Sequence, residues 1–589
     1  MSAIFTYKEF WALLTEFAAT LPQLLGKVPA TAHLVKDVDQ LLDSADSPFT
    51  VAVLGQMRSG KSTLLNALMG RDLAVVGDEE TTATTNWFKY TDVPELAESF
   101  NVHWREPPAG SAPQETVPLS EITRWTGDSV LARSTRYLEF FAPSPFLKEA
   151  NIVDTPGTRS VIHDHTDKVL ELISGTLAEK ERYEERLADE SKRQARGADA
   201  IVYVLMSLER QNDLTWLEEF ERLTRTPGTH PFNSIGVVHK WETVFDSRDA
   251  WARVQKKTEQ MRRAFLGTIS CLIPVSAPLG ILAERLKDDS RFWSELLRLG
   301  RDSTPESIEF ILYLENYFLD DVQGCSLTSD QRRALWNRIL AVYPGLPWAT
   351  LQVLVRSAQD FGHGGGEELR RRVFEMSGMP RLKAELSERY FARSKMIKAF
   401  SILSKAWLPC QSAQTILRNR KVALSNLIGR ARESSALLRA RIGGGESDLV
   451  SVLGYVVESL ETIEAEFRQA SDVLRTLSNT VVPIRDAFDD MKRDLEALSC
   501  LAEGRTGFGP EDAARLKALF GGDGPEVAER VGPFSEIHGH PTLREVERAI
   551  EYVSNMTPVE PTESTRLIQE SALIRLGQVA DWIEDHLAG

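Results

Sequence analysis

Apolar residues follow different patterns in successive parts of the chain. In residues 5–45 the apolar residues have helical spacing, and there is a break at Pro29. These apolar residues are Phe10, Leu13, Leu14, Phe17, Leu21 and Leu25. From residue 49 to about 283 the pattern changes to short apolar and β-branched runs: FTVAVLG, RYLEFFA, NIVDTPG, DAIVYVLM, SIGVVHK and CLIPVSA. Such runs, separated by polar or helical stretches, predict an α/β domain with a mostly parallel sheet.

Beyond Leu286 the spacing is helical almost to the end of the chain, with glycine-rich joints at 362–368, 442–447 and 504–525. From Leu453 to Leu498, fourteen apolar positions alternate steps of three and four, which predicts a bundle or coiled-coil seam. Pro483 falls inside this seam, and we expect a kink there because the register continues on both sides. The second half of the chain is therefore predicted to be an elongated helical bundle.

Length and charge narrow the class of protein. A chain of 589 residues is too long for a single core, so two or more domains are expected. The net charge of -16 argues against nucleic-acid binding, and no such partner is expected. The four cysteines have no short-spaced pair, and the N-terminus has no signal-peptide pattern, so a cytoplasmic, reducing setting is expected. Residues 264–283 lack charge but contain two prolines, and we predict a strand there rather than a membrane span.

The stretch GQMRSGKST fits a phosphate-binding loop between a strand and an apolar helix. The glycines let backbone N–H groups turn towards phosphates, Lys61 neutralises the outer two, and the Ser62 hydroxyl reaches Mg²⁺. The predicted phosphate contacts come from Gly55, Gln56, Met57, Arg58, Ser59, Gly60, Lys61, Ser62 and Thr63.

Other elements follow this loop in the order that a GTPase requires. NIVDTPG places Asp154 to hold the shell of Mg²⁺ and the Gly157 N–H to meet a γ-phosphate, and ETTATTN offers Thr82 as a further metal ligand. His239, Lys240 and Glu242 in HKWE, with Ser276 and Ala277, occupy the place where a GTPase reads its base. Glu242 keeps the carboxylate that pairs with guanine but is one methylene longer than the usual Asp. GTP with Mg²⁺ is the predicted substrate and cofactor.

These motifs, together with GADAIVYVLM and SGMPRLKAEL (377–386), resemble those of the bacterial dynamin-like GTPases of the dynamin superfamily. The resemblance implies a P-loop GTPase domain at 48–395, with a core at 48–288 and a helical insertion at 289–376 whose role it does not explain. It further implies neck helices at 1–47, a stalk at 396–560, and a C-terminal helix at 561–589 that returns to the neck. Its expected partners are a second copy through G-domain dimers, a second dynamin-like protein, and an anionic membrane contacted peripherally on the inner face of the cell membrane.

Arg58 raises the question of the catalytic group, because the glutamine that often follows the DxxG element is missing here. In the related guanylate-binding proteins and atlastins an arginine at this loop position acts in cis on the transition state. The alternative is that Arg58 faces solvent or pairs with an acid on the facing subunit. Ser59 is a second candidate, through its N–H or hydroxyl, and Lys61 and Thr82 complete the predicted catalytic set.

From Arg389 to Arg441 the chain has twelve Lys or Arg residues and one acid. This segment is predicted to form two helices broken at 407–410, and Lys398, Lys405, Trp407 and Leu408 near the break are candidate lipid contacts. The alternative is a bundle hairpin whose basic face packs on acidic helices of the same chain. GTP hydrolysis coupled to self-assembly and membrane tethering or remodelling is the leading functional hypothesis. A soluble scaffold GTPase that acts on protein partners is the competing one.

Overall fold

The computed structural model divides the chain into two compact units, 48–394 and 1–47 with 395–589. The residues that it describes are 7–35, 47–55, 59–74, 85–105, 112–127, 131, 134–154, 198–205, 231–243, 250–264, 269–362, 364–442, 447–502, 506–524, 526–534, 541–558 and 561–587. We call 48–394 the G unit and the remainder the helical unit, and each is described by itself.

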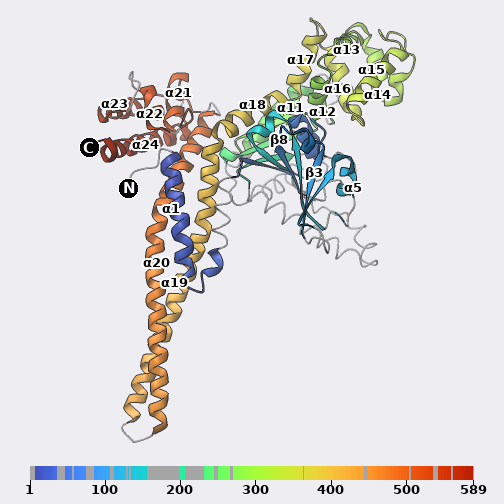
Figure 1. The fold of residues 1–589 in the computed structure, drawn as a ribbon. Coiled ribbons are helices and arrows are strands. Elements are labelled where there is room, and N and C mark those ends of the chain that lie inside the picture. The colour runs from blue at the N-terminus through green and yellow to red at the C-terminus, as the bar shows by residue number, and fades with distance from the viewer. Residues whose placement is uncertain are drawn as a thin grey trace. The chain divides into compact units, whose positions relative to one another are not determined.

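The G unit contains a sheet of nine strands in the order β4-β3-β5-β2-β6-β1-β7-β8-β9 (Figure 1). The strands are β1 (Thr50–Gly55), β2 (Asn86–Tyr90), β3 (Ser99–Trp104), β4 (Gln114–Pro118), β5 (Thr135–Ala142), β6 (Asn151–Asp154), β7 (Ala200–Leu205), β8 (Ser234–His239) and β9 (Cys271–Val275). Five pairings are parallel, whereas β2 with β6, β3 with β4, and β3 with β5 are antiparallel. The mostly parallel sheet is confirmed.

All six apolar runs that predicted strands form strands, as β1, β5, β6, β7, β8 and β9. Sequence reasoning missed β2, β3 and β4. The letters of β3 alternate polar and apolar residues, Lys89 interrupts the apolar residues of β2, and only one residue of β4 is buried. Strands near the edge of a sheet lack the continuous apolar run that marks a central strand such as β1, which is buried at every position.

Shorter helices accompany the sheet in the G unit: α3 (Lys61–Met69), α4 (Pro94–Ala97), α5 (Ile122–Gly127), α7 (Pro145–Glu149), α11 (Ala250–Ala264) and α12 (Ala277–Arg285). Short helical turns are η2 (Leu119–Glu121), η3 (Pro231–Asn233) and η4 (Trp241–Thr243). The predicted phosphate loop is the connection between β1 and α3.

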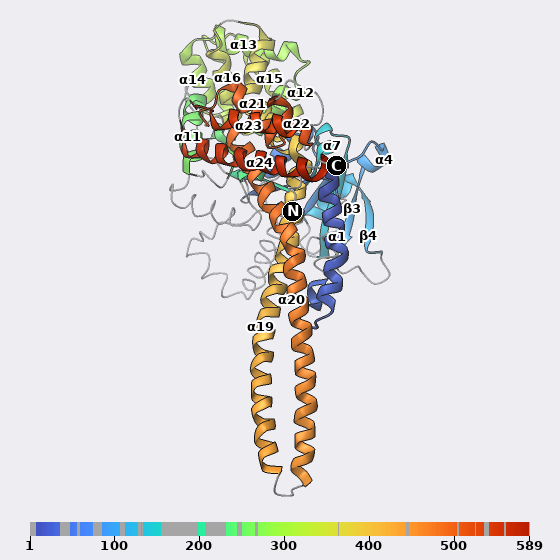
Figure 2. The ribbon, with the colours of Figure 1, turned by 90° about the vertical axis from the view of Figure 1, so that its left-hand side faces the viewer.

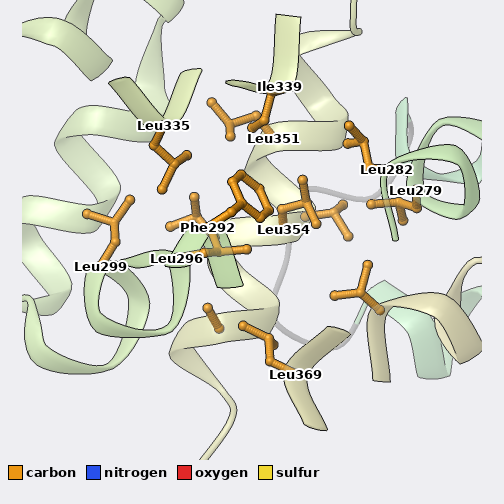
Figure 3. Close-up of a cluster of buried hydrophobic side chains, with 14 of the residues drawn as sticks. Leu279, Leu282, Phe292, Leu296, Leu299, Leu335, Ile339, Leu351, Leu354 and Leu369 are labelled. Atoms are coloured by element: carbon orange, nitrogen blue, oxygen red, sulfur yellow. The ribbon is translucent and has the colours of Figure 1, made fainter. Parts of the chain in front are cut away.

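Residues 289–376, which we call the insertion, are mainly helical, and their buried side chains share a core with α12. Its elements are α13 (Ser290–Asp302), α14 (Pro305–Tyr313), η5 (Glu315–Leu319), α15 (Ser329–Val342), α16 (Trp348–Gln359) and α17 (Gly366–Met376). The Asp289, Thr304 and Thr328 side chains cap α13, α14 and α15. Leu296, Leu335 and Leu354 meet in the core with Phe292 (Figure 3), and Leu279 and Leu282 of α12 join the same cluster.

A hydrogen bond joins a residue that precedes the insertion to the residue that follows it. The Ser276 N–H, at the start of α12, donates to the Ser377 carbonyl at 2.8 Å. The chain then continues through α18 (Met379–Glu385), η6 (Leu386–Tyr390) and η7 (Phe391–Arg393). The buried Tyr390 hydroxyl donates to the Ile201 carbonyl of β7 at 2.9 Å, which fastens this segment to the sheet. The insertion therefore interrupts the G unit, and α18 to η7 still pack on the sheet after it.

The helical unit is built around α1 (Tyr7–Gly26), α19 (Ser394–Ile442) and α20 (Ser447–Ala502). Figures 1 and 2 both show α1 lying along the first part of α19 and the facing part of α20. The shared core contains Leu21 and Leu25 of α1, Leu403 of α19, and Leu477 and Ile484 of α20. Every position of the predicted seam from Leu453 to Leu498 is buried or half-buried, and α20 continues through Pro483. The seam prediction is confirmed.

The predicted break at 407–410 is wrong, because residues 394–442 form one helix that runs through Pro409. A proline inside a helix costs about 3 kcal/mol. Beyond it, however, Cys410, Ala413 and Leu417 are fully buried against α1 and α20, and burying one large apolar side chain contributes about 1.5–3 kcal/mol. Tertiary packing therefore outweighs the local penalty. The side chains of Lys405, Trp407 and Leu408 lie outside the described residues.

Among the described residues, 418–442 of α19 and 447–469 of α20 form a part of the helical unit built from these two helices alone, and we call it the distal hairpin. α19 ends at Ile442 and α20 begins at Ser447, so the chain reverses its direction between these two residues and not at 407–410. Arg420 pairs with Glu466 and Arg432 pairs with Glu464, both at 2.6 Å. These pairs fit the alternative in which part of the basic face packs on an acidic helix of the same chain.

The rest of the helical unit consists of η1 (Ala32–Leu34), α21 (Pro510–Leu519), α22 (Val527–Val531), η8 (Gly532–Phe534), α23 (Leu543–Ser554) and α24 (Glu563–Leu587). The Trp582 indole of α24 donates to Glu9 of α1 at 2.8 Å. Within the part of the chain that the structure describes, no helix has both the length and the apolar character that crossing a bilayer requires.

Candidate functional site

The candidate site lies where four parallel strands of the G unit end. β6, β1, β7, β8 and β9 are neighbours in that order, so the carboxyl ends of β6, β1, β8 and β9 share one edge of the sheet. That edge collects Asp154, Gly55 and His239, which are the last residues of their strands, and Ser276, which follows β9. Residues that are far apart in the sequence are brought together by strand order alone.

The phosphate loop needs glycine at two described positions. A Cβ on Gly55 would stand 2.4 Å from the Val204 carbonyl oxygen of β7. Gly60 has φ 87°, a left-handed conformation that side chains disfavour, and a Cβ on it would stand 2.3 Å from Nδ1 of His239. Gln56, Met57 and Arg58, between these glycines, lie outside the described residues, as do Thr82 and Gly157.

Lys61 opens α3 and is buried beside the loop. Its Nζ donates to the Gly55 carbonyl at 3.3 Å, so the side chain folds back over the loop. Burial lowers the pKa of Lys61, and the charge of Asp154 opposes that shift. An ammonium held in this way is available to bind phosphate oxygens.

Asp154 is a buried carboxyl that fits a magnesium site. Burial raises its pKa to about 6, against the charge of Lys61 and the neighbouring Ser62 hydroxyl, which favour the ionised form. Neither carboxylate oxygen has a hydrogen-bond partner of good geometry among the described residues. A buried carboxylate in this state is stabilised by a cation, and Mg²⁺ is commonly held by one or two protein oxygens together with substrate phosphates. Ser62 and Asp154 therefore suit Mg²⁺.

His239 connects the phosphate loop to the base-reading segment. Its Nδ1 lies 3.1 Å from the Ser59 carbonyl, and its Nε2 accepts from the Ala277 N–H at 3.3 Å. Because Nε2 accepts, the proton of the neutral ring is on Nδ1, which donates to Ser59. Burial, and then the charge of Lys240, lower the pKa of His239 to about 3, so the ring stays neutral. His239 stands where GTPases usually have Asn or Thr, and its ring still supplies both a hydrogen-bond donor and an acceptor.

Glu242 lies in η4, on the short turn that follows β8. Burial raises its pKa to about 7, while its own N–H, the Ser276 hydroxyl and Lys240 favour the ionised form. Its two carboxylate oxygens lack a well-placed partner within the described ranges. Lys240 has φ 61°, which is uncommon for a residue other than glycine. A buried, unsatisfied carboxylate in this place suits the N1–H and N2–H donors of guanine.

Two features of the G unit were missed from the sequence. Arg285, the last residue of α12, donates to both carboxylate oxygens of Asp72 at 2.6 and 2.8 Å, and to the Val342 carbonyl at 3.1 Å. Tyr343, which directly follows α15 of the insertion, is half-buried, and burial raises the pKa of its hydroxyl. No motif marks these residues, because their role depends on how the insertion folds back.

Comparison with known proteins gives a family match at this part of the chain. Residues 51–241 match the model of the dynamin family. The isoniazid-induced protein IniC of Mycobacterium tuberculosis is 27% identical over 248 residues, which cover 41% of this chain and 44% of IniC. Dynamin-like protein 2 of Campylobacter jejuni is 27% identical over 135 residues, which cover 23% of this chain and 21% of that protein. The matches therefore span less than half of these relatives.

A comparison with solved structures gives matches of low score. One chain of an oligomerised bacterial dynamin pair is 13% identical and covers 94% of this chain and 83% of its own length, with a TM-score of 0.27. A score this low does not establish a common arrangement of the whole chain. The family match rests on the G unit.

Proposed function

We propose that this chain, whose residues 51–241 form a dynamin-family G domain, hydrolyses GTP with Mg²⁺ and couples turnover to self-assembly and membrane contact. Lys61 binds the outer phosphates, Ser62 and Asp154 hold the metal, and Glu242 pairs with guanine. The bound Mg²⁺ neutralises charge on the phosphates. The observation that carries the proposal is that these side chains lie at one edge of the sheet. The carboxylates of Asp154 and Glu242 are buried there without a hydrogen-bond partner among the described residues, so they suit a cation and N–H donors.

Thr82 and Gly157 are proposed to close on the metal and the γ-phosphate, as the dynamin-like resemblance implies. Arg58 is proposed as the cation that stabilises the transition state in cis, a role worth on the order of 10³ to 10⁵ in rate for arginine fingers. Replacing Arg58 by Ala should then leave GTP binding intact and remove the assembly-stimulated part of turnover. Equal stimulated rates in variant and parent would refute this role.

The distal hairpin supports the proposal of assembly or membrane contact. With two helices only, it leaves several large apolar side chains largely in solvent: Val422, Leu427, Leu437, Val450, Val452 and Tyr455. Arg439 and Arg441 lie near its turn and are exposed. Exposed apolar residues beside cations suit either an anionic lipid surface or another protein. In dynamin-like proteins the lipid-binding tip lies in the stalk, which favours lipid.

Liposome co-sedimentation with GTPase rates measured in the same tubes tests the proposal. The parent should pellet with anionic vesicles and hydrolyse GTP faster on them, whereas Lys61→Ala should pellet without turnover. Reversal of Arg439 and Arg441 to Glu should abolish pelleting. The matched control reverses Arg475 and Arg485, exposed cations on α20 within the three-helix part, and should pellet as the parent does.

The competing function is that of a scaffold GTPase that acts on protein partners without membrane contact. The insertion and the long helices would then serve as protein-binding arms. Turnover that is the same with and without vesicles, together with no pelleting, would favour the scaffold and contradict the membrane part of the proposal. Loss of turnover in Lys61→Ala would still support hydrolysis in that case.

A further inference from the structure

An exposed group of aromatic side chains lies on α14 and η5 of the insertion. One side of α14 is buried in the core of the insertion, whereas Phe310 and Tyr313 on its other side are 46% and 71% exposed, and Leu314 is 47% exposed. The Tyr317 ring of η5 stacks on Phe310 with 4.9 Å between ring centroids, and on Tyr313 with 6.1 Å. Single exposed apolar residues are ordinary, but a contiguous stacked group marks an interaction surface. We call these four residues the aromatic face.

The segment that carries the aromatic face is acidic. Residues 305–321 contain no Lys, Arg or His and five exposed acids: Glu306, Glu309, Glu315, Asp320 and Asp321. This charge repels an anionic lipid surface and a nucleic acid, and it favours a cationic partner. An arginine that lies over a tyrosine or phenylalanine ring is also attracted by the electrons of the ring. The aromatic face therefore suits a partner that combines apolar side chains with arginines.

The distal hairpin of the same chain has a surface of this opposite kind. Residues 418–442 of α19 include seven Lys or Arg and one acid, Glu433. Arg420 and Arg432 pair with acids of α20, whereas Arg430 and Arg441 form no ion pair within the described residues. Steps of four and three residues along α19 give one exposed stripe, which we call the basic stripe: Ala423, Leu427, Arg430, Ser434, Leu437 and Arg441.

We propose that the aromatic face of one copy binds the basic stripe of a second copy of this chain. The partner is a second copy because the chain carries both surfaces, which are complementary in charge, and stacked rings lose little freedom on binding. A contact between two different surfaces leaves one of each free, so it extends into rings or open filaments. The inference rests on the proposed function, since it names a contact through which the chain self-assembles. It also assigns a role to the insertion, which the dynamin-like resemblance left without one.

Sedimentation velocity of the full chain, without nucleotide or lipid, measures this contact apart from vesicle binding. A face variant carries Phe310→Ala and Tyr313→Ala, and a stripe variant carries Arg430→Glu and Leu437→Ala. The parent should form oligomers that grow with concentration. Each variant alone should need about tenfold higher concentration to associate, because aromatic and arginine side chains commonly dominate the binding free energy of a contact.

Mixing the two variants separates this contact from any other. The face variant keeps an intact basic stripe and the stripe variant keeps an intact aromatic face, so an equimolar mixture should form pairs that do not extend. Two control variants should associate as the parent does: Leu567→Ala on α24, at a side chain that is 58% exposed, and Arg475→Glu on α20. Thermal unfolding checks each variant, and Tyr313→Ser alone and Arg430→Glu alone replace a double variant that unfolds earlier than the parent.

Pairs in the mixture, together with weak association of each variant alone, support the proposal. Variants that associate as the parent does overturn it, and so does a mixture without pairs. A parent that stays monomeric at every concentration also overturns it.

GTP hydrolysis measured on the same samples distinguishes a failure of this inference from a failure of the proposed function. If the parent does not hydrolyse GTP, the proposed function fails whatever the sedimentation shows. If the parent hydrolyses GTP and self-associates while both variants sediment as the parent does, only the contact between the aromatic face and the basic stripe fails.

Discussion

Replacing His239 by Ala tests how the phosphate loop is held in place. The ring makes two contacts with backbone groups, with the Ser59 carbonyl and the Ala277 N–H, and both groups are buried away from water. A neutral hydrogen bond contributes about 1 kcal/mol, so the loss of both costs about 2 kcal/mol. If that energy orders the loop for the nucleotide, GDP binding should weaken about thirtyfold. The stability of the G unit should also fall, because a buried side chain is truncated.

A fluorescent GDP analogue titrated at constant Mg²⁺ measures the affinity, and thermal unfolding measures stability. His239→Asn keeps a donor and an acceptor on a shorter side chain and should recover part of the affinity. His103→Ala, on β3 and outside the site, should leave GDP binding unchanged. If His239→Ala binds GDP within about threefold of the parent, the phosphate loop does not depend on the hydrogen bonds of the His239 ring.

The pH behaviour of His239 follows from its lowered pKa. The unfolded chain takes up a proton near pH 6.5, whereas the folded ring does so only near 3. This group therefore contributes stability that is fully present above about pH 6.5 and is lost as the pH falls towards 3. Near neutral pH the folded ring does not titrate, so its hydrogen bonds should hold the phosphate loop equally well from about pH 6 to pH 8.

Two further predictions concern Glu242 and Asp494. Burial raises the pKa of Glu242 from 4.5 to about 7, and only the ionised carboxylate offers two acceptor oxygens to the two guanine N–H groups. GDP affinity measured without Mg²⁺ should therefore rise with pH, and the rise should approach tenfold per pH unit below the pKa. The same shift means that this group stabilises the nucleotide-free fold below pH 4.5 and loses that contribution as the pH rises through about 7, and a flat affinity in the parent would contradict the assignment. In the helical unit, Asp494 accepts from Arg575 at 2.6 and 3.0 Å and from Arg530 at 2.8 Å, all buried. Asp494→Asn should lower the free energy of unfolding in urea by about 3–5 kcal/mol, whereas the exposed Asp486→Asn should change it little.

Much of the site could be predicted from the sequence, because it is built from residues at the ends of strands. A buried parallel strand reads as a continuous apolar run, and the residue after the run must lie at the carboxyl edge of the sheet. Asp154, His239 and Ser276 were all placed by this reasoning. The chemical state of these groups was not predicted, since the pKa of a carboxyl depends on how completely the fold removes it from water.

The break assigned at Pro409 shows where local rules fail. A proline inside a helix is costly, and by propensity alone an end there was a reasonable prediction. Only the packing of α1 along the first part of α19 and α20 shows why the helix continues. The helical spacing of apolar residues correctly predicted a bundle. It did not predict that α1 ends at Gly26 and leaves the distal hairpin with two helices.

The sequence by itself determined the class of fold, the strand and helix at 50–69, the place of Asp154 at the end of a strand and the seam of α20, because each depends on a short-range pattern of apolar and polar residues. Tertiary structure decided which groups meet across long separations. Only the folded chain brings His239 between the predicted phosphate loop and Ala277, and Arg285 to both Asp72 and the Val342 carbonyl. Contacts of this kind arise from the packing of whole elements against each other, and that packing leaves no periodic signal in the sequence.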